Sequence, residues 1–322
     1  MILLCGIPSE VPLRMVADRL DDLDVPYVWF NQRRAADYEL DWEIVAGAVR
    51  GEFRDGSTRH RLEDFVGVYV RLMDDRILPE LTGEPDNSPA RQRCRALHDA
   101  LFTWYEVAPA RVVNRAEPQG SNGSKPYQAQ LIARHGFWVP ETLITNDPEL
   151  VREFRRQHGE VIYKSISGAR SIVHPLTDAD ADRLDDIRWC PVQFQAFVPG
   201  TNVRVHTIGG AAFATAVTTD VIDYRYAAHQ GGRTTLTEVE LSDELIKGCL
   251  DLSADLRLPF AGIDLKLAPD GRVFCFEVNP SPAYSYYEAN TGQPISLAVA
   301  RYLAGVAEEP GPSTLAAAGH VG

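Results

Sequence analysis

The stretch AGIDLKLAPDGRVFCFEVNPSPAYSYYE, residues 261–288, decides how the second half of this chain folds. Apolar residues alternate with other residues over 263–267, a second and largely apolar run covers 273–278, and Pro-Asp-Gly at 269–271 lies between the two runs. A period of two is typical of β-strands, and Pro, Asp and Gly are typical of turns. The stretch therefore predicts a β-hairpin with one apolar face.

Asp264, Glu277 and Asn279 are expected on one face of this hairpin. Glu277 and Asn279 are two residues apart in one strand, so their side chains point the same way. A four-residue connection, 268–271, would place Asp264 on that side as well. Two carboxylates and an amide are hard oxygen donors of the kind that bind Mg²⁺. The alternative is a solvated face of an edge hairpin, but charge is confined to one face of a hairpin that should be buried.

The motifs of this stretch resemble a known family. Gly-Ile-Asp at 262–264, Phe-Glu-Val-Asn-Pro at 276–280 and Thr-Gly at 291–292 resemble the metal-binding end of ATP-grasp ligases, especially the RimK-like branch and the graspetide (microviridin-type) peptide ligases. The resemblance covers residues 112–306 well and 1–111 loosely. It implies an α/β protein, with an α+β ATP-grasp fold preceded by a Rossmann-like pre-ATP-grasp domain.

The resemblance also implies the cofactors. In that family the Asp, Glu and Asn at these places hold two Mg²⁺ ions that bridge the ATP phosphates. Asp264, Glu277 and Asn279 are therefore the expected metal ligands, with ATP and two Mg²⁺ ions as cofactors and Mn²⁺ as the alternative ion.

Length and composition set the class of the protein. A chain of 322 residues suggests two or three domains, and 45% hydrophobic with 24% charged residues is ordinary for a soluble globular protein. The net charge of −13 argues against nucleic acid or an anionic membrane as the main partner. No segment reaches the roughly 20 apolar residues that span a bilayer, and the amino terminus predicts a strand instead of a signal peptide. Five scattered cysteines without a Cys-x-x-Cys pair predict a reduced, cytoplasmic protein without structural zinc.

Residues 1–113 are expected to form the first domain. A strand, helix, strand opening, with strands at 2–5 and 27–30, predicts a parallel Rossmann-like sheet. Residues 44–62 predict an inserted hairpin with an Asp-Gly turn, 66–71 a central strand and 88–105 a long helix. Because G-x-G-x-x-G and G-x-x-x-x-G-K-[ST] motifs are absent, this domain is not expected to bind the nucleotide by itself.

The remaining boundaries follow from the resemblance and from composition. Residues 114–189 are expected to form the small, central ATP-grasp subdomain, and residues 190–306 the carboxyl-terminal subdomain with the metal site. Residues 307–322 lack periodicity and predict a loose tail.

Two lysines are the expected phosphate ligands. Lys125 begins a helix, where the helix dipole opposes a cation, so an anion is expected nearby; the alternative is a solvated first-turn lysine. Lys164 ends a strand and enters a small-residue loop with Ser167 and Gly168, whose backbone N–H groups could cradle phosphate. The resemblance assigns both lysines and this loop to the ATP phosphates.

Residues 190–200 resemble the strand that carries adenine in the family. The expected nucleotide-binding residues are Gln195, Phe197 and Val198, together with Lys266 from the hairpin. A Gln-Glu pair is common in the family, whereas Gln195 is followed here by Ala196. Adenine would then rely on backbone groups near Phe197 and Val198.

Two arginines are the expected catalytic residues. Arg204 matches the family's phosphate or substrate arginine, and Arg225 is expected to orient the substrate carboxylate, because a guanidinium binds a carboxylate with two hydrogen bonds. Ser281, Tyr284 and Tyr286 are expected to border the same cleft and contact a substrate. The alternative for the tyrosines is packing at the domain edge.

The implied activity is an ATP-dependent carboxylate-amine or carboxylate-hydroxyl ligase that forms an acyl phosphate. A small amino acid or peptide and a precursor peptide both remain open as substrates, since residues 281–287 lack the Gly-Gln-Trp-like run of graspetide ligases. The alternatives are a graspetide-type macrocyclase that forms side-chain esters or amides, and a nucleotide-binding protein without catalysis. A Ser/His hydrolase has no G-x-S-x-G motif, and a homo-oligomer remains open.

Overall fold

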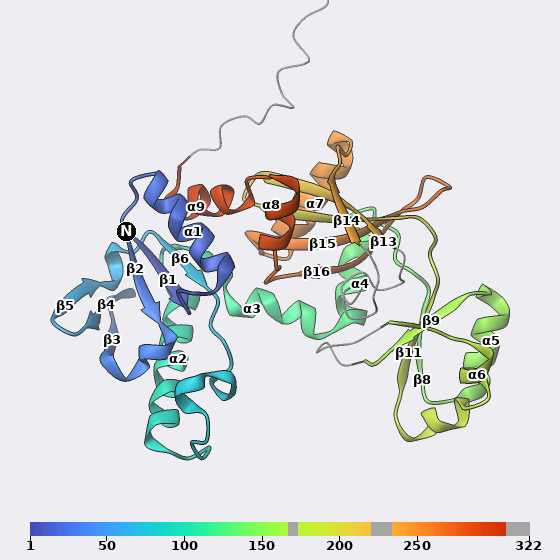
Figure 1. Cartoon of the computed structure of the whole chain (residues 1–322), viewed down its shortest axis with the longest axis horizontal. Helices are drawn as coiled ribbons and strands as arrows, with labels where there is room; N and C mark the ends of the chain where they lie inside the picture. Colours follow the sequence, from blue (N-terminus) through green and yellow to red (C-terminus); the bar gives the residue numbers. More distant parts are fainter. Residues whose placement is uncertain (167–172, 220–233, 307–322) are drawn as a thin grey trace, which may run out of the picture.

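The structure is a computed structural model that describes residues 1–166, 173–219 and 234–306. Its amino-terminal strands form a parallel sheet in the order β2-β1-β6-β7 (Figure 1). The strands are β1 (Ile2–Gly6), β2 (Tyr27–Asn31), β6 (Gly67–Val70) and β7 (Arg111–Val113). Helix α1 (Val11–Asp22) packs on the face that carries Ile2 and Leu4, and α2 (Pro89–Val107) packs on the face that carries Leu3 and Cys5. The predicted Rossmann-like opening and long helix are confirmed.

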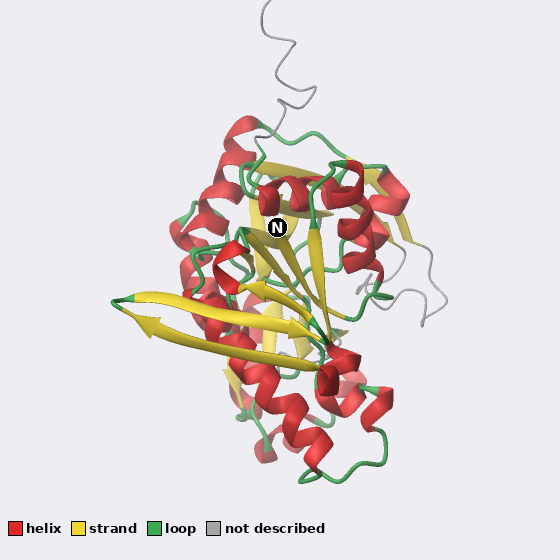
Figure 2. Cartoon of the chain, turned by 90° about the vertical axis from the view of Figure 1, so that its left-hand side faces the viewer, coloured by secondary structure: helices red, strands yellow, loops and turns green. Residues whose placement is uncertain are grey.

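A separate antiparallel sheet extends from the side of this domain (Figure 2). It consists of β3 (Tyr38–Val45), β4 (Ala48–Asp55) and β5 (Thr58–Arg61). Strands β4 and β5 are the hairpin predicted over 44–62, and the prediction missed β3. Aromatic packing attaches β3 to this hairpin, since Tyr38 of β3 and Phe53 of β4 are both buried with their ring centres 5.1 Å apart.

The central part of the chain forms an antiparallel sheet in the order β10-β9-β11-β8. It contains β8 (Thr142–Thr145), β9 (Val161–Lys164), β10 (His174–Pro175) and β11 (Val192–Ala196), and it follows the helices α3 (Ala116–Gln119) and α4 (Lys125–Arg134). Helices α5 (Pro148–His158) and α6 (Asp178–Ala181) lie on one side, around the core of Val151, Val161 and Phe194. The strand alternation turns Lys164 and Gln195 to the other side.

The carboxyl-terminal part forms a larger antiparallel sheet in the order β14-β13-β12-β15-β16. The strands are β12 (Thr201–Ile208), β13 (Ala211–Thr219), β14 (Thr234–Glu238), β15 (Phe260–Leu267) and β16 (Val273–Asn279). Residues from α4 and α7 (Asp243–Asp255) pack on one face. The other face is divided: one end packs on α8 (Ser285–Thr291) and α9 (Ile295–Ala304), and the rest is polar.

One hydrophobic core joins this sheet to the first domain. It contains Ile208 and Phe260 from the sheet, Val299 from α9 and Leu13 from α1. Helix α9 therefore lies between the two sheets (Figure 1). The proposed boundaries after residues 113, 189 and 306 stay predictions, and the expected tail lies outside the described residues. No helix in the described ranges combines the length and the apolar composition needed to cross a membrane.

The hairpin of β15 and β16 has the predicted polar face, but its connection differs from the expected one. The residues between the strands are 268–272, one more than expected, and this alone would turn Asp264 away from Glu277. A β-bulge corrects the register, because Leu265 pairs with Cys275 and Asp264 pairs with Glu277, which leaves Phe276 as the extra residue. Asp264 and Glu277 are thus direct cross-strand neighbours.

Two buried amides hold this hairpin in position. The side chain of Asn114 donates to the carbonyls of Phe260 at 2.6 Å and of Pro280 at 2.5 Å, and accepts from the N–H of Phe260 at 3.1 Å. The side chain of Gln128 in α4 donates to the carbonyl of Val278 at 2.8 Å and accepts from its N–H at 2.9 Å. Gln128 therefore satisfies the backbone N–H and carbonyl of Val278 on the outer edge of β16, which a neighbouring strand would otherwise pair.

We expect Gln128→Leu to lower the free energy of unfolding by about 2–4 kcal/mol, because it leaves a buried N–H and a buried carbonyl of Val278 unpaired. Chemical denaturation measures this change. Gln130→Leu is the control, since Gln130 is exposed on the same helix and should change stability by less than about 0.5 kcal/mol. Equal effects of the two substitutions would contradict the role of Gln128.

Candidate active site

The cleft between the central sheet and the carboxyl-terminal sheet contains a cavity of about 110 Å³. Seven of the predicted site residues line this cavity: Lys164, Gln195, Phe197, Val198, Asp264, Lys266 and Glu277. The other residues that line it are Ile162, Val173, Asn202, Val203, Leu265 and Phe276. Residues from β9 and β11 and residues from β12, β15 and β16 therefore meet in one place. Of the other predicted residues, Ser167, Gly168 and Arg225 lie outside the described part of the chain.

The carboxylates of Asp264 and Glu277 lie opposite each other in the floor of this cleft, each less than a fifth exposed. Like charges directly across a sheet repel each other. Each of the two is paired with a cation from another element: Glu277 with Lys125 at 2.9 Å and Asp264 with Arg204 at 3.1 Å. The two ion pairs balance the negative charge of the floor.

Lys125 is the first residue of α4, where the helix dipole disfavours a cation. Its ammonium donates to Asn122 Oδ1 at 2.6 Å and contacts Glu277 Oε2 at 2.9 Å. The anion expected near this lysine is thus a carboxylate of the protein, and the ion pair attaches the start of α4 to β16.

Arg204 lies in β12 directly opposite Asp264, and it is 7% exposed. Its guanidinium carbon is 5.8 Å from the ring centre of Tyr287 in α8. A Cβ atom on Gly262 would lie 2.5 Å from Nη1 of Arg204, so the glycine provides the space that the guanidinium occupies. Sequence reasoning missed the role of Tyr287, because an aromatic residue in a helix shows no sign of the cation it will meet.

The segment after β16 only partly matches its prediction. The Asn279 side chain lies on the same face as Glu277, and its Oδ1 accepts from the N–H of Ser281 at 2.9 Å. Ser281 accepts a hydrogen bond from Arg71 at 3.4 Å, which links this turn to the first domain. The substrate contact predicted for Tyr284 is wrong, because Tyr284 is 0% exposed and its hydroxyl donates to the carbonyl of Pro12 at 2.5 Å. Tyr286 is 53% exposed.

The donor atoms of the predicted metal site suit Mg²⁺, because two carboxylates and an amide oxygen lie on one rigid strand pair. In the described ranges, no group of three or more His, Cys, Asp or Glu side chains has the arrangement of a metal site. Asp264 and Glu277 form only a pair of carboxylates, so other ligands of an ion here would be the Asn279 amide, water or phosphate oxygens.

The far end of the cavity is aromatic. The Lys266 ammonium lies 5.3 Å from the ring centre of Phe197 and 5.9 Å from that of Phe276, and burial lowers the pKa of Lys266. The N–H of Phe197 donates to the carbonyl of Glu160 at 2.9 Å, so that N–H is engaged within the protein. The amide of Gln195 donates to Thr142 Oγ1 at 3.1 Å.

His206 is a buried titratable residue beside this site. It follows Arg204 by two residues on the same face of β12, and its ring lies 4.8 Å from that of Tyr287. In the described part of the chain, neither ring nitrogen of His206 has a hydrogen-bond partner. Burial and, to a smaller extent, the charge of Arg204 lower the pKa of His206 well below its ordinary value, so the ring is neutral.

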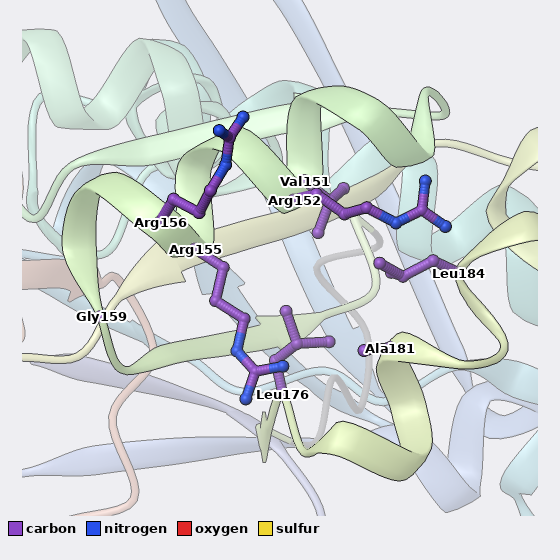
Figure 3. A pocket seen from close by; sticks show the side chains of 8 residues that line it. All are labelled: Val151, Arg152, Arg155, Arg156, Gly159, Leu176, Ala181 and Leu184. Carbon is purple, nitrogen blue, oxygen red and sulfur yellow. The ribbon is translucent and has the colours of Figure 1, made fainter.

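A second cavity, of about 290 Å³, lies on the helical side of the central sheet (Figure 3). Its walls are apolar at Val151, Leu176 and Leu184, and three arginines of α5 surround it. Each arginine is paired with an acid: Arg152 with Glu149, Arg156 with Glu153, and Arg155 with Asp178. None of the predicted site residues lines this cavity.

A family model described as the RimK-like ATP-grasp domain matches residues 123–303 of this chain. Among curated proteins, a probable alpha-L-glutamate ligase of Aliivibrio salmonicida is 24% identical over 209 residues, which cover 61% of this chain and 68% of the relative. A second probable alpha-L-glutamate ligase, from Teredinibacter turnerae, is 24% identical over 215 residues, 63% of this chain and 70% of the relative.

Solved structures resemble nearly the whole chain. A Chryseobacterium gregarium RiPP-associated ATP-grasp ligase, in complex with ADP and a leader and core peptide, has a TM-score of 0.80 at 19% identity and covers 96% of this chain and 97% of its own. The ATP-grasp ligase PsnB, complexed with minimal precursor, Mg and ADP, has a TM-score of 0.76 at 26% identity, over 95% of this chain and 96% of its own. The fold prediction is thereby confirmed.

We expect the buried His206 to make stability depend on pH. The unfolded chain binds a proton at His206 below about pH 6.5, whereas the folded chain does not, so the free energy of unfolding falls as pH drops below 6.5. The loss from this one group is at most about 1.4 kcal/mol per pH unit. Urea unfolding between pH 7 and pH 5 measures it. In His206→Leu the slope should be smaller, and an unchanged slope would show that His206 does not cause it.

Proposed function

The chain belongs to the RimK-like ATP-grasp family, and on this premise we propose that it is an ATP-dependent ligase that joins a carboxylate to an amine or a hydroxyl, with a peptide as its substrate. The observation that carries the proposal is the cleft itself: two sheets bring Lys164, Asp264 and Glu277 around one cavity. Charge-neutralising side chains on rigid strands are what phosphoryl transfer needs from a protein.

The proposed reaction has two steps. A carboxylate oxygen of the substrate attacks the γ-phosphorus of ATP, ADP leaves, and an acyl phosphate forms. The nucleophile then attacks the acyl carbon, inorganic phosphate leaves with the bonding electron pair, and the nucleophile loses its proton. Because the protein forms no covalent bond in either step, its residues position the reactants and neutralise charge.

We assign Asp264, Glu277 and Asn279 to two Mg²⁺ ions. When bound, such ions neutralise charge on the phosphates. The assignment suggests a role for the two ion pairs of the floor. Lys125 and Arg204 pair with these carboxylates at 2.9 and 3.1 Å. Ions held by the carboxylates would supply positive charge in their place, and both cations would then be available to the phosphates or the substrate.

The other predicted residues keep their proposed roles. Lys164 serves the phosphates from the opposite wall, with the loop of Ser167 and Gly168, and Gln195, Phe197 and Val198 border the base. Arg225 orients the substrate carboxylate. We place the reaction in the cytoplasm because all five cysteines of the structure are unpaired thiols.

A precursor peptide is the substrate we favour. The structural likeness to ligases bound to a leader and core peptide or to a minimal precursor extends over 96% and 95% of this chain, and it includes the first domain. The second candidate is the addition of glutamate to a peptide or small amine, as the names of the curated relatives suggest.

Mass spectrometry separates these substrates. We expect a short peptide encoded beside the gene, incubated with the protein, ATP and Mg²⁺, to lose the mass of one water for each crosslink, with ADP released in equal amount. A product that has gained a glutamyl residue would support the second candidate. Absence of ADP release with every candidate substrate, while nucleotide still binds, would contradict a ligase and favour a binding protein.

We expect Glu277→Gln to lower ADP release at least a hundredfold with the fold intact, because the substitution removes one anionic oxygen ligand from the site where phosphate charge must be neutralised. Steady-state kinetics and circular dichroism measure these two effects. Asp270→Asn is the matched control, since this exposed acid of the same hairpin pairs only locally with Arg272. Near-normal turnover of Glu277→Gln would exclude Glu277 as a metal ligand.

A further inference from the structure

The sheet of β3, β4 and β5 projects from the first domain as an arm (Figure 2). The arm lies on the side of the first domain that faces away from the central sheet (Figure 1). None of the residues that line the cavity of the cleft belongs to the arm. A role of the arm is therefore separate from the reaction in the cleft.

The tip of the arm is apolar on both faces. Residues 44–49, IVAGAV, are uncharged, and Ile44 and Val45 are 65% and 37% exposed. Ala46 and Gly47 form the two-residue turn, with φ of +50° and +81°. Asn, Asp or Gly is usual at the first of these positions, because a left-handed φ strains a residue with a Cβ atom. The chain thus has an apolar residue where a polar one would fit the turn better, and exposed apolar tips of this kind suit a contact with another protein.

Strand β3 is an edge of this sheet. In the described part of the chain it pairs only with β4, over eight residues and without a bulge. Because the turn has two residues, strand alternation directs the N–H and C=O groups of Leu40, Trp42 and Ile44 away from β4. The strand contains no Pro or Lys, which commonly protect an edge from pairing. This edge can therefore pair with an extended segment of another chain.

One face of β3 carries an apolar row, Tyr38, Leu40, Trp42 and Ile44. Tyr38 is buried in the core of the first domain, Leu40 and Trp42 pack partly buried against that core, and Ile44 is exposed. The row thus runs from the core to the tip without a polar residue. A strand beside β3 would extend this row, so its side chains on this face are expected to be apolar.

The other face of β3 carries an acidic row, Glu39, Asp41 and Glu43. Arg54 of β4 contacts both Glu39 and Asp41 at 2.7 Å. Glu43 lies opposite Arg50, and in the described ranges no ion pair of Glu43 is found. The strand itself has three negative charges and no positive one. Two copies of β3 would bring acids together, and like charges across a sheet repel each other, so the edge suits a basic strand and disfavours a second copy.

We propose that β3 docks a partner protein through an extended basic segment, in which lysine or arginine alternates with apolar residues. The segment pairs with the outward backbone groups of β3, packs its apolar side chains on the apolar row, and directs its cations to the acidic row. The apolar tip contacts the body of the same partner. This interaction goes beyond the proposed ligase reaction, because the arm contributes no residue to the cavity of the cleft.

Three labelled probe peptides of eight residues test the proposal by fluorescence polarisation. Lysine alternates with valine in the first probe, and glutamate replaces lysine in the second. The third is the lysine probe with every valine N-methylated, which removes the N–H groups that would pair with β3. We expect the lysine probe to bind and the other two to bind at least tenfold more weakly. Hydrogen exchange at the amides of Leu40, Trp42 and Ile44 should slow in the complex.

Two variants with matched controls locate the contact. Ile44→Thr should weaken the lysine probe about fivefold, whereas Ile77→Thr, a residue outside the arm with the same exposure of 65%, should not. Glu43→Lys should also weaken it about fivefold, whereas Glu240→Lys, an exposed acid outside the arm, should not. Because all four sites lie at the surface, the variants are expected to fold, and ADP release should be unchanged in each.

Three kinds of result would overturn the proposal. Failure of the lysine probe to bind at millimolar concentration, or equal binding of the lysine and glutamate probes, would exclude a basic partner at this edge. A dimer in sedimentation that Ile44→Thr dissociates would assign the edge to a second copy of the chain. Loss of ADP release in Ile44→Thr, with the fold intact by circular dichroism, would place the arm in the ligase reaction instead.

Discussion

Two carboxylates lie opposite each other on neighbouring strands, and the rest of the cleft is built to balance their charge. Asp264 and Glu277 repel each other across the sheet, and each is paired with a cation from a different element. Arg204 comes from β12 and Lys125 from the start of α4. The same two pairs attach α4 and β12 to the hairpin, so charge balance and tertiary structure depend on one arrangement.

The position of these carboxylates in turn depends on buried amides and on a shared core. Asn114 hydrogen-bonds Phe260 at the start of β15 and Pro280 directly after β16. Gln128 hydrogen-bonds the backbone of Val278 at the outer edge of β16. Helix α9 packs on both the first domain and the carboxyl-terminal sheet. The floor of the cleft is therefore a rigid surface, which favours accurate placement of ligands.

Much of this could be predicted from the sequence, because the information is local. Strand alternation places Glu277 and Asn279 on one face, the Pro-Asp-Gly turn indicates a hairpin, and the family motifs point to Lys125 and Lys164. Asp264 and Glu277 share a face as expected, but the expected four-residue connection is wrong. A five-residue connection and a bulge at Phe276 compensate for each other, and neither leaves a signal in the residue types.

The sequence by itself determined where carboxylate, amide and cationic side chains occur along the strands of the hairpin, since strand period and turn chemistry depend on near neighbours. Tertiary structure alone decided the contacts between residues far apart in the chain. It placed Tyr287 against Arg204, and it brought the rings of Phe197 and Phe276 to 5.3 and 5.9 Å from the Lys266 ammonium. It also buried Tyr284, which the pattern left open. These contacts depend on how sheets pack and where a bulge lies, and packing is set by the whole chain.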